Sequence, residues 1–175
     1  MKRIASALIF AALAAASASP ATATDVFGGI YKHDVKLPTD LSGVEKGWDF
    51  QLGLRGGGIG HTPLQPYVFG ALNSAGDTSY VAAGLSAKFG GSIFIRPGLG
   101  IALHTGSATK YDIPGNGKIE FGSRVLFEPE LGIGMQVAPM VTAEASWVHM
   151  SHATLFGNQN PGIDNLGVRV TVGIP

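Results

Sequence analysis

Three residues near the C-terminal end of the chain carry side chains that together could hydrolyse an ester. His149 and Ser151 are separated by one residue, and Asp164 lies at the start of the last apolar segment. A histidine can take the proton from a serine hydroxyl and make it a nucleophile toward a carbonyl carbon, while a carboxylate orients the histidine. The residue types therefore predict acyl transfer, provided that the fold brings the three side chains to one surface.

The segments that must position these residues have the pattern of short strands. Glycine makes up 26 of the 175 residues, charged residues are only 14%, and no long apolar run follows the N-terminal region, which argues against a helical membrane protein. Gly, Pro, Asn and Asp mark the breaks between segments. Long and short breaks alternate along the chain, which is typical of an outer-membrane barrel. We predict eight strands, at 25–33, 45–57, 63–74, 77–88, 92–105, 122–136, 139–152 and 163–174.

The composition excludes several other classes of protein. Lys plus Arg equals Asp plus Glu at 12 each, which argues against a nucleic-acid partner held by a basic surface. The absence of cysteine excludes disulfide frameworks and thiol catalysis. No set of ligands has the spacing of a metal site, so we expect neither a metal nor another cofactor.

The N-terminus has the pattern of a secretory signal peptide. Lys2 and Arg3 precede an apolar, alanine-rich stretch, and small residues follow up to Ala23. We therefore predict a signal peptide over residues 1–23 and a barrel domain over residues 24–175. An exported chain without cysteine fits the periplasm or the bacterial outer membrane.

Within the predicted strands, apolar residues alternate with polar residues and glycine. Successive side chains of a strand point to opposite faces, so one face of the sheet is apolar and the other is polar. The charged residues of the polar face nearly balance in sign and could pair across a narrow lumen; they are Arg55, Arg96, Arg124, Arg169, Glu128, Glu130 and Glu144. We predict an all-β, eight-stranded antiparallel transmembrane β-barrel with a filled polar interior. A soluble periplasmic barrel with the apolar face inside is the alternative, since parity alone does not distinguish inside from outside.

The same parity places the three candidate residues on one patch. His149 and Ser151 continue the lipid-facing stripe of 139–152, just after Trp147, which we interpret as an interfacial aromatic residue. Asp164 has the lipid-facing parity of the neighbouring antiparallel strand, and it lies at that strand's outer end. We therefore predict Ser151 as nucleophile, His149 as base and Asp164 as the orienting acid. Polar residues that merely tolerate the membrane interface are the alternative.

Several segments of the chain are similar to a known family. They are His149–Ala153, Asn160–Arg169, Leu72–Ser79, Arg96–His104 and Gly122–Phe127. In these segments the chain resembles the lipid A 3-O-deacylase family (PagL-like, also called acyloxyacyl hydrolase-like). The likeness extends over the chain after the signal peptide and is densest at 147–169.

The resemblance implies an eight-stranded outer-membrane barrel that removes the 3-O-linked acyl chain of lipid A at a site facing the outer leaflet. It implies Ser151 as nucleophile and His149 as general base, and it puts Asp164 where the family often has glutamate. His152 stands where an asparagine commonly follows the serine, and its main-chain N–H is the expected oxyanion donor. Lipid A or lipopolysaccharide is then the substrate and the outer membrane the environment, and a homodimer is the assembly to test. The rival hypothesis is a non-catalytic structural or adhesion barrel with a degenerate site.

Overall fold

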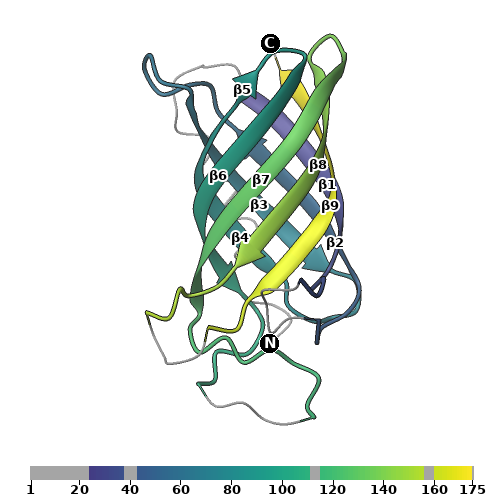
Figure 1. Cartoon of the computed structure of the whole chain (residues 1–175), viewed down its shortest axis with the longest axis vertical. Coiled ribbons are helices and arrows are strands. Elements are labelled where there is room, and N and C mark those ends of the chain that lie inside the picture. The colour runs from purple at the N-terminus through teal and green to yellow at the C-terminus, as the bar shows by residue number, and fades with distance from the viewer. Residues whose placement is uncertain (1–23, 38–42, 111–114, 156–159, 175) are drawn as a thin grey trace.

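The strands form one closed antiparallel barrel (Figure 1). The computed structural model describes residues 24–37, 43–110, 115–155 and 160–174, so the predicted signal peptide lies outside the described residues. Its strands are β1 (Thr24–Lys32), β2 (Trp48–Arg55), β3 (Leu64–Asn73), β4 (Tyr80–Ala87), β5 (Phe89–Gly90), β6 (Ile93–His104), β7 (Val125–Ala138), β8 (Val141–Met150) and β9 (Ile163–Ile174). The order in the sheet is β4-β3-β2-β1-β9-β8-β7-β6-β5, and an additional β4–β6 pairing closes the ring.

β5 is the continuation of β4 and not a separate strand of the wall. Ser86 pairs with Gly98 and Phe89 pairs with Ile95, so both segments keep one register along β6 and are interrupted only at Lys88. The wall therefore has eight strands, as predicted. The described part of the chain contains no helix that is long and apolar enough to cross a membrane.

The apolar face of the sheet is the outer face. Ile93 is 71% exposed and Leu52 is 61% exposed, whereas the alternate residues of the same strands, such as Arg55 at 0%, are buried. This confirms the predicted orientation, and the soluble barrel with an apolar interior is wrong. A closed sheet with an apolar outer wall satisfies its backbone hydrogen bonds internally, which is what the bilayer requires.

Ion pairs fill the middle of the lumen. Arg169 Nη2 lies 2.6 Å from Glu130 Oε2, and Arg96 Nε lies 3.3 Å from Glu144 Oε1. Glycine leaves room for these side chains: a Cβ on Gly98 would lie 2.6 Å from Glu130 Cγ. The lumen is therefore packed with paired charges, as the polar set of the sequence predicts, with one correction. Arg124 is not part of this set, because it precedes β7, is exposed, and donates to the carbonyl oxygens of His104 and Gly106.

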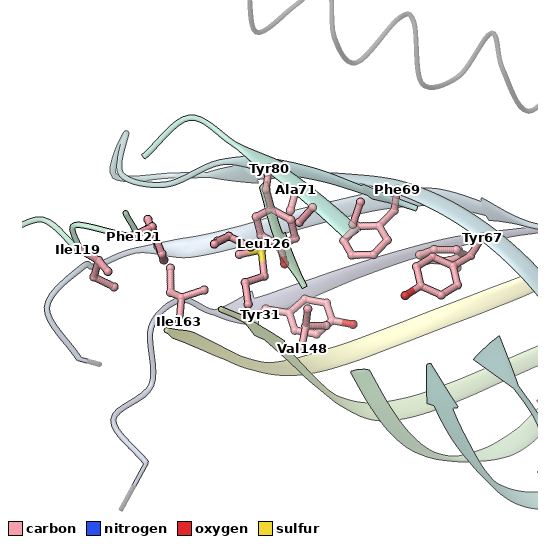
Figure 2. Close-up of a cluster of buried hydrophobic side chains, with 14 residues drawn as sticks. Tyr31, Tyr67, Phe69, Ala71, Tyr80, Ile119, Phe121, Leu126, Val148 and Ile163 are labelled. Atoms are coloured by element: carbon pink, nitrogen blue, oxygen red, sulfur yellow. The ribbon is translucent and has the colours of Figure 1, made fainter. Parts of the chain in front are cut away.

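Buried aromatic side chains extend from Phe121 in the connection between β6 and β7 into the lumen as far as Tyr67 (Figure 2). Phe69 meets Tyr80 edge to face with ring centroids 5.7 Å apart, and Tyr67 stacks on Phe69 at 6.0 Å. Ile119 and Phe121 come from the connection between β6 and β7, so this loop contributes to the buried cluster. The loop end of the barrel is thus closed by side chains, and no open pore is expected.

A buried charge cluster holds the first loop to the barrel mouth. His33 Nδ1 lies 2.8 Å from Asp49 Oδ2, and His33 Nε2 lies 3.1 Å from Glu45 Oε2. Glu45 also accepts the main-chain N–H groups of Thr78 and Ile119, at 3.0 and 3.3 Å. The cluster therefore joins the first loop to the second loop, between β3 and β4, and to the third loop, between β6 and β7.

Asp34 extends this network to the last strand. Its carboxylate accepts the N–H groups of Val44 and Glu45, at 2.6 and 2.7 Å, and its own N–H donates to Asn165 Oδ1 at 3.0 Å. Next to it, the N–H of Val35 donates to the carbonyl oxygen of Asp164 at 2.7 Å. The first loop is thus bonded to the segment that carries the candidate acid.

The charge on His33 should make the stability of the barrel depend on pH. Burial alone would lower the pKa of His33, but the hydrogen bonds and charges of Asp49 and Glu45 outweigh it and raise the pKa from 6.5 to about 9. Because the pKa of His33 is higher in the folded state than in the unfolded state, protonation of His33 stabilises the folded barrel. This stabilisation, roughly 3 kcal/mol, is fully present below pH 6.5 and is lost as the pH rises through about 9. His33→Gln should therefore lower the urea midpoint of the detergent-folded barrel strongly at pH 6 and weakly at pH 10. An equal difference at both pH values would contradict this assignment.

Candidate active site

β8 and β9 place a histidine and a carboxylate directly opposite each other on the outer wall. His149 pairs with Asp164 in the register of these strands, which run side by side (Figure 1). His149 Nδ1 lies 3.0 Å from Asp164 Oδ1, with the side chains 20% and 2% exposed. A carboxylate oxygen can only accept, so the Nδ1 atom carries a proton, and in the neutral imidazole the lone pair is on the Nε2 atom. This is the tautomer that a general base needs.

Ser151 continues β8 beyond its last assigned residue. The N–H of Phe127 donates to the Ser151 carbonyl oxygen at 2.8 Å, and the N–H of Ser151 donates back to Phe127 at 3.2 Å. Residues paired in this way share a face of the sheet, and Phe127 is on the exposed outer face. Ser151 is therefore on the same side of the wall as His149, about 6.5–7 Å along the strand, a gap that two side chains can bridge.

The imidazole of His149 is held between two neighbours. The Trp147 ring stacks beside it with centroids 5.8 Å apart and an interplanar angle of 26°. Behind it lies Gly162, where a Cβ would be 2.7 Å from His149 Cε1 and 3.2 Å from Nε2. Only glycine allows the returning chain to approach the ring this closely, so Gly162 limits the positions that the imidazole can adopt.

The indole of Trp147 also contacts the acid. Its Nε1 donates to Asp164 Oδ1 at 2.6 Å, on the same oxygen that faces His149. Sequence reasoning missed this role of Trp147 and interpreted the residue as an interfacial anchor. The sequence does contain one signal for this role, because the parity of Trp147 puts it on the same face of β8 as His149. Gly162 has no signal in the sequence beyond its place in the family-like segment Asn160–Arg169.

The residues after Ser151 form a tight turn. His152 is buried, and a Cβ on Gly122 would lie 3.5 Å from its Nε2. Ala153 and Thr154 both have positive φ, at 52° and 60°, which is uncommon for residues with a Cβ. Such strained conformations concentrate at functional sites. The His152 ring therefore packs toward Gly122 of the third loop, and its carbonyl oxygen accepts the N–H of Leu155 at 3.0 Å within the turn.

The remaining described features do not form a second site of this kind. His33 and Asp34 are buried and hydrogen-bonded within the network that holds the first loop to the barrel mouth. A groove at the mouth is lined by residues of the second and third loops, including Asp77 and Lys118, and none of the three candidate residues lines it. Within the described residues, no group of three His, Asp or Glu side chains is arranged to hold a metal ion.

Comparison with known proteins identifies the family. A family model described as lipid A 3-O-deacylase (PagL) matches residues 33–172, a range that includes His149, Ser151 and Asp164. Among curated protein sequences, none matches this chain.

Solved outer-membrane barrels share the fold. The crystal structure of the outer membrane enzyme PagL is 20% identical with a TM-score of 0.60, covering 86% of this chain and 99% of that one. The crystal structure of Neisserial surface protein A is 15% identical with a TM-score of 0.56, covering 85% and 96%. A de novo designed transmembrane β-barrel is 9% identical with a TM-score of 0.55, covering 89% and 98%. At these identities the structural likeness shows the fold alone, whereas the family model covers most of the chain. The chain therefore belongs to the lipid A 3-O-deacylase (PagL) family of outer-membrane β-barrels.

Proposed function

We propose that this protein hydrolyses the 3-O-linked acyl ester of lipid A in the outer leaflet of the outer membrane, using Ser151, His149 and Asp164. The observation that carries the proposal is the 3.0 Å contact between His149 Nδ1 and Asp164 Oδ1 on the lipid-facing wall. A structural barrel has no need of a desolvated carboxylate on that wall, because burying a charge there is costly unless it is paired. Family membership supports lipid A as the substrate.

The reaction follows from the groups at the site. Ser151 Oγ attacks the ester carbonyl carbon while His149 Nε2 takes the hydroxyl proton, and the negative charge of Asp164 stabilises the imidazolium. The bond between the carbonyl carbon and the ester oxygen then breaks, and the imidazolium gives its proton to that oxygen, which leaves as the 3-hydroxyl of the sugar. Water attacks the acyl-Ser151 ester by the same route, which releases the fatty acid and restores the serine.

The tetrahedral oxyanion needs a donor beside Ser151. We assign this role to the main-chain N–H of His152, at the start of the turn that contains the two positive-φ residues. A main-chain donor does not depend on the side chain, so a histidine can stand where relatives have asparagine.

The location of the site determines how the substrate reaches it. Phe127 on β7 lies beside Ser151, and Leu131 on β7 and Leu166 on β9 lie on either side of Trp147, so exposed apolar side chains flank the site along the wall. The acyl chains of lipid A can lie along this surface in the hydrocarbon layer while the ester reaches Ser151 from the side. The enzyme therefore needs no enclosed pocket, and no cofactor enters the reaction. For export, we propose that residues 1–23 act as a signal peptide that is removed, leaving residues 24–175 as the barrel.

Lipid A mass spectrometry tests the proposal directly. Expression of the wild-type chain in a host that lacks such an enzyme should remove one hydroxyacyl chain from lipid A. Ser151→Ala should abolish the loss, and Asp164→Asn should slow it by about 10⁴-fold, because the histidine then loses its orienting charge. Unmodified lipid A from cells with a folded, heat-modifiable wild-type barrel would instead support the rival non-catalytic barrel.

Gly162 provides a test of the geometry. Gly162→Ala would place a methyl group 2.7 Å from His149 Cε1, so the ring must move, and displacement by about 1 Å costs about 100-fold in rate. We expect kcat to fall by that factor while the barrel stays folded.

Gly91→Ala is the matched control, because a Cβ on Gly91 would meet no atom within 4 Å. Its activity should equal that of the wild type. Full activity of Gly162→Ala would show that Gly162 does not confine the His149 ring.

A further inference from the structure

Trp147 makes a hydrogen bond that an ordinary interfacial tryptophan does not make. Such residues usually direct the indole N–H toward lipid headgroups or water. Here Nε1 donates to Asp164 Oδ1 at 2.6 Å. The cross-strand partner of Trp147 is Leu166, so the indole leans along the wall, past its direct partner, to reach the acid of the next outward-facing pair.

Two donors converge on one oxygen of the acid. Asp164 Oδ1 accepts from Trp147 Nε1 and lies 3.0 Å from His149 Nδ1. The aspartate side chain is 2% exposed, so it cannot rely on bulk water for solvation. A buried carboxylate requires hydrogen-bond donors, and bonds to a charged acceptor are among the strongest in proteins. The indole thus supplies part of the solvation of the acid and directs its oxygen toward the histidine.

The ring of Trp147 acts on the histidine as well. The two ring centroids are 5.8 Å apart with an interplanar angle of 26°, and Gly162 also confines the imidazole. Lys32 is the direct partner of Leu166 on the neighbouring strand, and its Nζ atom lies over the Trp48 ring at 5.6 Å.

We propose that Trp147 is a positioning residue of the active site, which orients Asp164 through its indole N–H and His149 through its ring. This rests on the proposed deacylase function. Trp147 does not touch the reacting atoms; it acts through the acid and the base. The role is specific to Trp147, since Trp48, the other tryptophan of the chain, is exposed on β2, and its indole has no hydrogen bond among the described residues.

The kinetic test removes only the N–H donor. Trp147→Phe keeps an aromatic ring at the interface, and loss of a hydrogen bond to a charged group should lower kcat by about 10- to 100-fold with KM unchanged. Trp48→Phe is the matched control and should keep wild-type kcat. Wild-type kcat in Trp147→Phe, or an equal loss in both variants, would overturn the proposal.

A second measurement does not depend on activity. With ¹⁵N-labelled tryptophan in detergent-folded protein, the two indoles give two N–H signals, and Trp48→Phe assigns them. Asp164→Asn should move the Trp147 signal upfield, because the acceptor loses its charge, and should leave the Trp48 signal in place. An unmoved Trp147 signal would overturn the contact.

The two measurements separate this proposal from the function on which it rests. If the wild-type protein does not deacylate lipid A but Asp164→Asn moves the indole signal, the proposed function fails and the positioning role fails with it, while the contact stands. If lipid A is deacylated and Trp147→Phe is fully active, only the positioning role is overturned.

Discussion

The alternation of side chains across a closed wall is the constraint on which the rest of this structure depends. Each strand must present every second residue to hydrocarbon, because the closed sheet leaves the bilayer no other surface to contact. Charged residues consequently fill the lumen, where Arg169 pairs with Glu130 and Arg96 with Glu144. A polar residue on the outer wall breaks this alternation, and His149 and Asp164 do so together at the loop end of the barrel.

The cross-strand pair exists only in one register of β8 and β9. A slip of one residue would turn Asp164 into the lumen and separate it from His149. The mouth network opposes such a slip, because Asp34 and Val35 bond to Asn165 and to the main chain of Asp164. The buried charges of His33, Glu45 and Asp49 thus have a structural role that supports the site, although they are not part of it.

Much of this arrangement could be predicted from the sequence, because parity is a local property. The alternation of apolar and polar residues was enough to predict the eight strands, the two faces of the sheet and the common surface of His149, Ser151 and Asp164. It could not predict contacts in which a side chain reaches beyond its own strand position. Arg124 shares the inward parity but precedes β7 and bonds to loop carbonyl groups, and Trp147 bends past Leu166 to Asp164. The buried state of His33 was also unpredictable, since its partners come from a loop and another strand.

Trp147 can report directly on whether the candidate active site faces hydrocarbon. In Trp48→Phe protein reconstituted into bilayers, the fluorescence of Trp147 can be measured with lipids brominated along the acyl chains and with aqueous acrylamide. We expect strong quenching by bromine on the chain segments near the headgroups and weak quenching by acrylamide. Quenching by acrylamide without any effect of the brominated lipids would place the site in water and would rule out an active site that faces hydrocarbon.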